Sequence, residues 1–338
     1  MRCNTLYMTE KALNTAIRHS FVVGSFRILS MPDIFLDHFV FAGSLDRLIA
    51  KLIRLRTSGG RLVLDQEVTL GGNAFNFGLH AARLGCSVTL VASTAKYVFE
   101  LVRQSVRGLD YNTDHLAVTS TPPLTIALEF IDKGRNLNYN INSPGALANF
   151  GAGNFPKDLL ESHFDLIGFF NWTNNLLGTQ LAESVLPSFN CIKLFDTPDP
   201  LVVGRRAPEL RRVLDLVDIV CCNEVEACSM STILGKRTTD PLEASLNLAS
   251  QGLLVGLHAK GFTAEVNGSR VTKRAWKKAK VLRVTGAGDA WTAAFALSYL
   301  DGVTPELRLK FANWYARTYL MDENERGVRR RSALRGYM

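Results

Sequence analysis

The chain has 338 residues, and its 39 lysines and arginines against 31 aspartates and glutamates give a formal charge of +8. The segments 1–30 and 326–338 carry net charges of +3 and +5, so residues 31–325 are formally neutral. This distribution argues against a nucleic-acid or membrane-surface partner, and a hydrophobic fraction of 47% excludes a mostly disordered chain.

Two further classes of protein are disfavoured by the sequence. No apolar stretch reaches the roughly 18–20 residues that a membrane-spanning helix needs, and residues 1–20 lack the apolar core of a secretion signal. The six cysteines have neither a disulfide-framework spacing nor a metal-ligand spacing. We therefore expect reduced thiols and a cytoplasmic protein.

Short apolar runs that alternate with helix-like segments predict the fold class. The runs at 88–92, 165–170, 191–195 and 217–222 are typical of buried strands, and a longer apolar or amphipathic segment follows each of them. This pattern predicts an α/β protein with a doubly wound, mostly parallel sheet and helices on both faces.

Two segments, 38–70 and 112–142, interrupt that rhythm with alternating apolar and polar residues and turn residues. We expect them to pair as a small antiparallel β-lid outside the main sheet. The domain would span residues 27–325. Residues 1–26 are predicted to be a poorly ordered N-terminal extension, and residues 326–338 a basic C-terminal tail.

The sequence GGNAFNFGLHAARLG at 71–85 predicts a helix that packs closely against its neighbours, because small residues recur at helical spacing. Gly71 and Gly72 precede this helix, and Asn76 lies in its first turn, where backbone and side chain can meet a polyhydroxylated ligand. A tightly packed helix capped by Asn73 is the alternative explanation.

The segment 217–226 runs from a strand into Asn-Glu-Val-Glu. Asn223 and Glu226 have the spacing of a helix capping box. The same position is where α/β folds bind ligands, so Glu226 is also a candidate for contact with hydrated Mg²⁺ and nucleotide phosphates. The two interpretations are compatible.

The segment 284–302, VTGAGDAWTAAFALSYLDG, predicts a tight turn followed by a helix that is apolar nearly all round. The turn Gly286-Ala-Gly288 would direct backbone N–H groups at one spot and so form an anion site, with Asp289 facing it from the first helical turn. Such an arrangement suits phosphoryl transfer to a hydroxyl group. Close packing of the glycines, with Asp289 as a first-turn charge, is the structural alternative.

The segments at 71–85, 223–226 and 285–295 together resemble the PfkB or ribokinase-like family of carbohydrate kinases, and the resemblance extends over about residues 27–320. It implies a ribokinase-like fold with a β-lid that closes over a sugar. It also implies ATP as phosphoryl donor, Mg²⁺, a small-molecule sugar or nucleoside as acceptor, and a homodimer formed through the lid.

The resemblance also implies roles for individual residues. Asp289 would be the catalytic base, with the amides of Gly286, Ala287 and Gly288 as the anion hole. For the acceptor, the resemblance implies Gly71, Gly72, Asn76, Asn171 and Asp37. Of these, Asp37 matches the acid of the family's first strand. The residues implied for the donor nucleotide are Asn223, Glu226, Gly261, Thr285 and Asn313, with Glu226 also near the metal.

Two departures from the family pattern leave alternatives open. Arg283-Val284 replaces the usual Asp-Thr, which makes dependence on a monovalent cation doubtful. The nucleotide loop is Gly-Leu-His-Ala-Lys-Gly at 256–261, where His258 is either a donor contact or an ordinary loop residue. An ADP-linked sugar kinase and a non-catalytic sugar- or nucleoside-binding protein of the same fold therefore remain alternatives.

Overall fold

The computed structural model describes residues 26–55, 60–132, 135–276 and 286–321. The predicted extension 1–26, apart from Phe26, and the predicted tail 326–338 lie outside the described residues, as does Thr285. Within the described part of the chain, no helix is long and apolar enough to cross a membrane.

The body is built on one large sheet, which has nine strands among the described residues, in the order β15-β14-β13-β12-β11-β10-β1-β4-β6. The strands from β13 to β6 pair in parallel, whereas β13–β14 and β14–β15 are antiparallel. The bounds are β1 Arg27–Met31, β4 Ser87–Leu90, β6 Tyr111–Asn112, β10 Leu166–Phe170, β11 Ile192–Asp196, β12 Ile219–Cys222, β13 Leu254–Ala259, β14 Phe262–Asn267 and β15 Arg270–Ala275. The predicted doubly wound, mostly parallel sheet is confirmed, and the antiparallel edge is an addition to it.

Helices cover both faces of this sheet and create two hydrophobic cores. Side chains of successive strand residues point to opposite faces, so Ile28 and Cys221 belong to one core and Leu29 and Cys222 to the other. The helices of the first core are α3 Asn73–Arg83, α4 Lys96–Ser105, α9 Ala287–Leu300 and α10 Pro305–Leu320; those of the second are α5 Gly178–Val185, α6 Leu210–Leu214, α7 Glu224–Ile233 and α8 Pro241–Ala249. Short 3₁₀ helices span Gly145–Asn149, Ala152–Asn154, Lys157–Glu161, Trp172–Asn174, Leu186–Ser188 and Pro200–Glu209.

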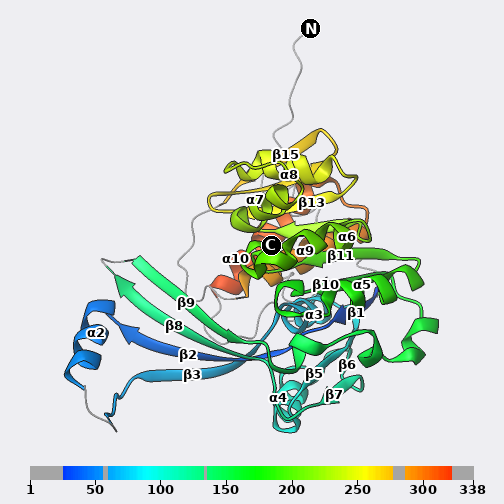
Figure 1. Ribbon diagram of the computed structural model, residues 1–338. Helices are drawn as coiled ribbons and strands as arrows, with labels where there is room; N and C mark the ends of the chain where they lie inside the picture. The colour runs from blue at the N-terminus through cyan, green and yellow to red at the C-terminus, as the bar shows by residue number, and fades with distance from the viewer. Residues whose placement is uncertain (1–25, 56–59, 133–134, 277–285, 322–338) are drawn as a thin grey trace.

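A separate sheet projects from the body as an arm (Figure 1), and we call it the lid. Its four described strands follow the order β3-β2-β8-β9. Their bounds are β2 Phe35–Gly43, β3 Asp65–Gly71, β8 Leu124–Asp132 and β9 Arg135–Ser143, and helix α2, Leu45–Arg54, lies between β2 and β3 in the chain.

The predicted lid was wrong in three details. Strands β2 and β8 pair in parallel rather than antiparallel, because both leave the body in the same direction and return through β3 and β9. The 38–70 segment also contains α2. Finally, the start of the 112–142 segment belongs to the body, where β6 pairs with β4 and β7, Leu116–Val118, pairs with β5, Ala92–Thr94.

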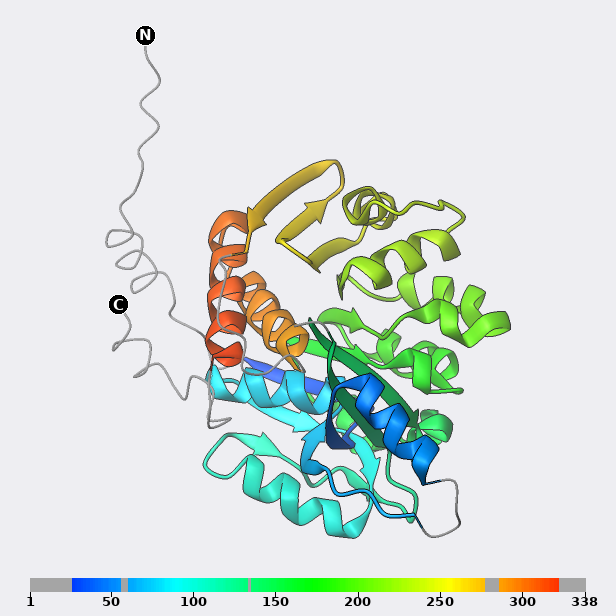
Figure 2. The same cartoon turned by 90° about the vertical axis from the view of Figure 1, so that its left-hand side faces the viewer.

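The parallel strands bring four polar residues to one edge of the main sheet. Asp33 follows β1, Asn171 follows β10, Asp196 ends β11 and Asn223 follows β12. The carboxyl ends of neighbouring parallel strands are where open α/β sheets bind ligands. This edge also faces the starts of α3 and α9, which pack against each other (Figure 2).

Candidate functional site

Asp289 lies at the centre of the candidate site, in the first turn of α9. Its carboxylate accepts two hydrogen bonds from α3: Asn73 Nδ2 donates to Oδ1 at 3.2 Å, and Asn76 Nδ2 donates to Oδ2 at 2.9 Å. The N-cap residue of this helix is Gly286, whose positive φ of 82° suits glycine, and no side chain of the described residues caps the turn. A carboxylate with a fixed orientation therefore lies beside the N-terminus of a long buried helix.

Gly71 and Gly72 leave room for two carboxylates. A Cβ added to Gly71 would overlap the Asp37 carboxylate, and one added to Gly72 would lie 2.7 Å from Asp33 Oδ2. Gly72 also has a positive φ of 94°. Asp37 belongs to β2 of the lid, so the description of it as a first-strand acid was wrong; the acid that follows the first strand is Asp33.

Asp33, which the sequence analysis did not single out, is buried, and both of its carboxylate oxygens accept hydrogen bonds. Its carboxylate accepts hydrogen bonds from Asn73 N and Ala74 N at 2.9 Å and from Asn171 Nδ2 at 3.0 Å. Asn171 has the left-handed φ of 53°, and its Oδ1 accepts from Asn174 Nδ2 at 2.7 Å. The predicted cap of α3 by Asn73 was therefore wrong, because the cap comes from Asp33.

The carboxyl groups at this edge have raised pKa values, mainly because they are buried, and the Asp33 charge adds to the rise at Asp37, Asp196 and Asp289. Burial raises the pKa of Asp33 and of Asp37 to about 6 and that of Asp196 to about 7. Burial also raises the pKa of Asp289 well above its usual value, and the neighbouring Asp196 charge adds to the rise. Asp196 accepts a hydrogen bond from Thr292 of α9 at 3.2 Å, and it is a second residue that the sequence analysis missed.

The predicted capping box at the start of α7 is present. Asn223 Oδ1 accepts from the backbone N–H groups of Val225 and Glu226, and Glu226 Oε2 accepts from Asn223 N at 2.7 Å. Burial raises the pKa of Glu226 well above its usual value, with the Asp196 charge as the next cause. The cap and the proximity to Asp196 occur together, so the helix cap does not exclude a ligand role for Glu226.

The other residues predicted for the donor nucleotide that the structure describes lie in α10 and in the turn between β13 and β14. Asn313 of α10 accepts a 2.8 Å hydrogen bond from Trp291 Nε1, and its own buried Nδ2 has no hydrogen-bond partner among the residues that the structure describes. His258 of β13 packs against Trp291 and lies beneath Gly288, where an added Cβ would be 3.2 Å from its Cε1. Burial lowers the pKa of His258 to about 4. Gly261 forms the β13–β14 turn with a positive φ of 92°.

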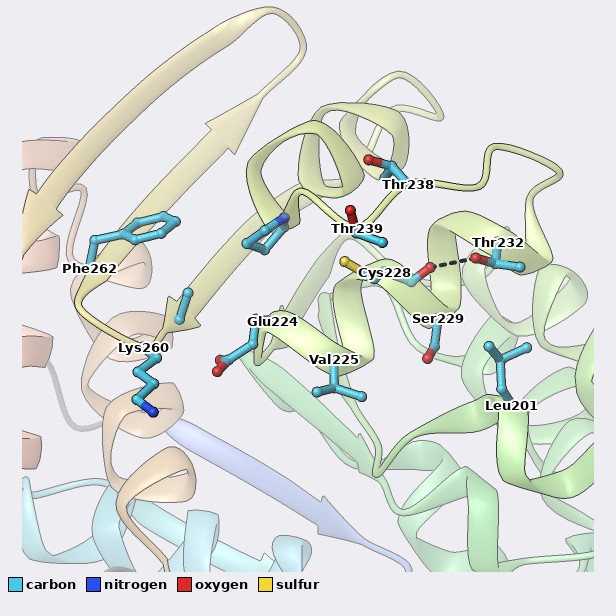
Figure 3. A pocket seen from close by; sticks show the side chains of 12 residues that line it. Leu201, Glu224, Val225, Cys228, Ser229, Thr232, Thr238, Thr239, Lys260 and Phe262 are labelled. Atoms are coloured by element: carbon cyan, nitrogen blue, oxygen red, sulfur yellow. Dashed lines mark hydrogen bonds between the residues drawn. The ribbon is translucent and has the colours of Figure 1, made fainter. Parts of the chain in front are cut away.

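A cavity of about 450 Å³ opens beside this turn. Figure 3 shows it bordered by α7, with Val225 and Ser229, and by the turn, with Lys260 and Phe262. Its lining includes Glu224, so the cavity adjoins two of the segments predicted for the donor nucleotide.

The sequence held partial signals for the missed residues. Asp33 follows a buried strand, and Asp196 ends another, which is the position where α/β folds place ligand groups. Asn73 was noted only as a cap. Its side chain instead reaches across to Asp289, a contact between residues 216 positions apart that no local pattern predicts.

The chain is similar to known carbohydrate and nucleoside kinases. A ribokinase of Arabidopsis thaliana is 31% identical over 143 residues, a stretch that covers 40% of this chain and 38% of the relative. The solved structure of Arabidopsis thaliana ribokinase with ribose and ATP superposes with a TM-score of 0.69 at 20% identity, covering 89% of this chain and 94% of that one. The Burkholderia thailandensis nucleoside kinase with inosine gives a TM-score of 0.73 at 15% identity, covering 92% and 96%.

These structural likenesses establish a ribokinase-like fold. The family model described as pfkB family carbohydrate kinase matches residues 43–324, which include both glycine segments, the capping box and Asp289. This protein therefore belongs to the pfkB family of carbohydrate kinases.

Proposed function

We propose that this protein transfers the γ-phosphoryl group of ATP to a hydroxyl group of a sugar or nucleoside. The observation that carries the proposal is the Asp289 carboxylate, which Asn73 and Asn76 orient at the N-terminus of α9. A fixed proton acceptor beside a helix N-terminus combines the two groups that phosphoryl transfer to an alcohol requires. The relatives that bind ribose with ATP, or inosine, support the same substrate classes.

In this proposal Asp289 accepts the proton of the acceptor hydroxyl. The hydroxyl oxygen forms a bond to the γ-phosphorus while the bond from that phosphorus to the β–γ bridging oxygen breaks, and ADP leaves. The amides of Gly286, Ala287 and Gly288 stabilise the negative charge on the transferred group. Asp289 afterwards releases its proton to solvent.

We assign the acceptor site to the lid side of Asp289. Asp37, Gly71, Gly72, Asn76 and Asn171 would form this site. Gly71 gives the Asp37 carboxylate the room to bind a diol. Asp33, Asp37 and Asp289 bring three carboxyl groups together here, and their ionised forms repel a phosphate, so the site favours a neutral acceptor over a phosphorylated sugar.

Mg²⁺ fits the acidic residues between α7 and β11. Glu226 and Asp196 provide oxygen ligands. Burial raises the pKa of both, and the Asp196 charge adds to the rise at Glu226, a repulsion that a divalent cation would relieve. No group of three or more metal-ligating side chains occurs in the described part of the chain. The ion, when bound, would neutralise phosphate charge and be held by one or two carboxylates, phosphates and water, as is usual for Mg²⁺.

For the donor nucleotide we propose Asn223, Gly261, Asn313 and, outside the described residues, Thr285. Asn313 Nδ2, which has no partner in the described part of the chain, supports this assignment, because a buried N–H group is costly unless another group accepts from it, as a bound nucleotide could. If the protein is an enzyme, ADP remains the alternative phosphoryl donor, since Gly256 and His258 depart from the family's nucleotide loop. No observation favours dependence on a monovalent cation.

We further propose a homodimer formed through the lid. The register places Val68, His38, Ile126 and Ile141 in one row across the four strands, on the face opposite Asp37. Val68, Ile126 and Ile141 are exposed, as are Leu124 and Tyr139 on the same face. This row contains no Asp, Glu, Lys or Arg, so it can pair with an identical face of a second copy.

A cytoplasmic location is also part of the proposal. The five described cysteines are free thiols, which suits a reducing compartment. No feature of the site calls for a nucleic acid or a membrane as partner.

A substrate screen tests the function. Purified protein is assayed for phosphate transfer to a panel of neutral sugars and nucleosides, with ATP and with ADP as donor and with Mg²⁺. Transfer from ATP to a panel member is expected. Transfer from ADP alone would favour the ADP-linked alternative, and ligand-stabilised melting without any transfer would favour a binding protein.

A further inference from the structure

The first turn of α3 has an unusual hydrogen-bond arrangement. The first four N–H groups of a helix have no partner within the helix, and here the N-cap residue, Gly72, has no side chain to offer. Asp33 supplies three acceptors instead. Its Oδ2 accepts from Asn73 N, its Oδ1 from Ala74 N, and its backbone oxygen from Phe75 N at 3.2 Å.

The next N–H group, that of Asn76, makes the first ordinary helical hydrogen bond, to Gly72 O at 2.9 Å. The N–H groups of residues 73–76 therefore all have protein partners. These four groups are not available to bind an acceptor, so the contribution of Asn73 and Asn76 to the site comes from their side chains.

We propose that Asp33 is a positioning residue that sets the orientation of Asp289 through the first turn of α3. The proposal rests on the proposed function. The same turn that Asp33 fixes carries Asn73 and Asn76, whose side-chain amides hold the two oxygens of Asp289. Asp33 is 1% exposed, so it acts within the protein framework rather than on the substrate.

Asp33 also fixes the opposite wall of the site. It accepts from Asn171 Nδ2, which ties the loop after β10 to the start of α3. Arg206 also contacts that loop. Its guanidinium lies 4.2 Å from the centre of the Trp172 ring and donates hydrogen bonds to the Thr173 and Asn175 backbone oxygens. One buried carboxylate thus connects β1, α3 and the loop after β10.

The replacement Asp33→Asn tests this role, because it keeps the shape but puts an amide group against backbone donors. Its matched control is Asp240→Asn, which alters the N-cap of α8, where Asp240 accepts from Leu242 N. With an acceptor found in the screen, Asp33→Asn is expected to lower kcat by about tenfold or more and to change KM much less. The Asp240 variant should keep its kcat.

A double variant distinguishes a positioning role of Asp33 from a role in helix capping alone. If Asp33 acts through Asn76, adding Asn76→Ala to Asp33→Asn should cost little further kcat, whereas additive losses would overturn the proposal. A kcat for Asp33→Asn close to that of wild type would overturn it as well. Should Asp33→Asn not fold, Asp33→Ser, which keeps a capping oxygen, is used in the same comparison.

Hydrogen exchange gives a readout that needs no activity. Amides 73–76 should exchange faster in the Asp33 variant, and those of α8 should not. If wild-type protein transfers phosphate to no acceptor, the proposed function fails, and exchange alone then tests whether Asp33 holds this turn. Unchanged exchange at 73–76 would overturn the inference.

Discussion

Asn76 donates its side-chain amide to Asp289 Oδ2 at 2.9 Å, across 213 residues of sequence. This hydrogen bond connects the first turns of α3 and α9, the two helices that carry the most informative sequence segments. A hydrogen bond to the ionised form of a carboxyl group lowers its pKa, and here it partly offsets the rise that burial causes. The proton affinity of Asp289 therefore depends on a residue from the other end of the chain.

Replacing Asn76 with alanine should make Asp289 a poorer base at neutral pH. Without the donor, the pKa of Asp289 rises further, so a smaller fraction is ionised at pH 7. The acidic limb of the kcat/KM profile is expected to move to higher pH, with a fall of about tenfold in rate at pH 7. Asn247→Ala is the control, because Asn247 donates to Ser231 away from the site. An acidic limb that stays in place or moves to lower pH would contradict the assignment of Asp289 as the base.

Asp289→Asn should nearly abolish turnover. An amide cannot accept the proton of the acceptor hydroxyl, and loss of a general base costs about 10²–10⁴-fold in rate. The fold and acceptor binding should be retained, measured by thermal melting and calorimetry. Asp215→Asn, at an exposed carboxyl group after α6, is the control and should keep full activity. Full activity in the Asp289 variant would remove this residue as the base.

Gly71→Ala should damage acceptor binding through Asp37. The new Cβ would overlap the Asp37 carboxylate, so that side chain must leave its position in the site. We expect the acceptor KM to rise by about tenfold or more. Gly153→Ala is the matched control, because no atom lies within 4 Å of an added Cβ there and its φ is not positive. An unchanged KM would indicate that Asp37 does not contact the acceptor.

Much of the fold was predictable from the sequence because its determinants are local. Apolar runs such as 165–170 and 217–222 gave the buried strands β10 and β12, and Asn-Glu-Val-Glu gave the capping box of α7. The segment after Gly286 gave a helix buried nearly all round, ended by Gly302 with a φ of 68°. Each of these features follows from the residue types within a short, continuous stretch of sequence.

The site was only partly predictable because its decisive contacts are not local. Asp33 caps a helix 40 residues later, a relation that no spacing rule contains. The parallel pairing of β2 with β8 depends on where two distant hairpins leave the body, so alternation alone suggested antiparallel strands. Asn313 was matched to a nucleotide contact, but the structure shows its oxygen bonded to Trp291, which no sequence pattern indicated.

Ile141→Asp should disrupt the proposed dimer. Ile141 is exposed on the edge strand β9, at one end of the apolar row on the lid, and a charge there opposes the burial of that face. Wild-type protein is expected at twice the 37.4 kDa chain mass in light scattering, and the variant at the chain mass. Asn140→Asp places the same charge on the other face of β9 and should leave the dimer intact. A monomeric wild type would exclude lid pairing.

Two substitutions of Glu226 should separate its roles as helix cap and metal contact. Glu226→Gln keeps an oxygen that can accept from Asn223 N, so the capping box and the stability should persist while the charge is lost. Glu226→Ala loses both, and should also destabilise the fold by about 1 kcal/mol. If Glu226 helps to hold Mg²⁺, both variants need about tenfold more Mg²⁺ for half-maximal activity. If it only caps α7, the Gln variant behaves like wild type in the Mg²⁺ titration and only the Ala variant melts earlier.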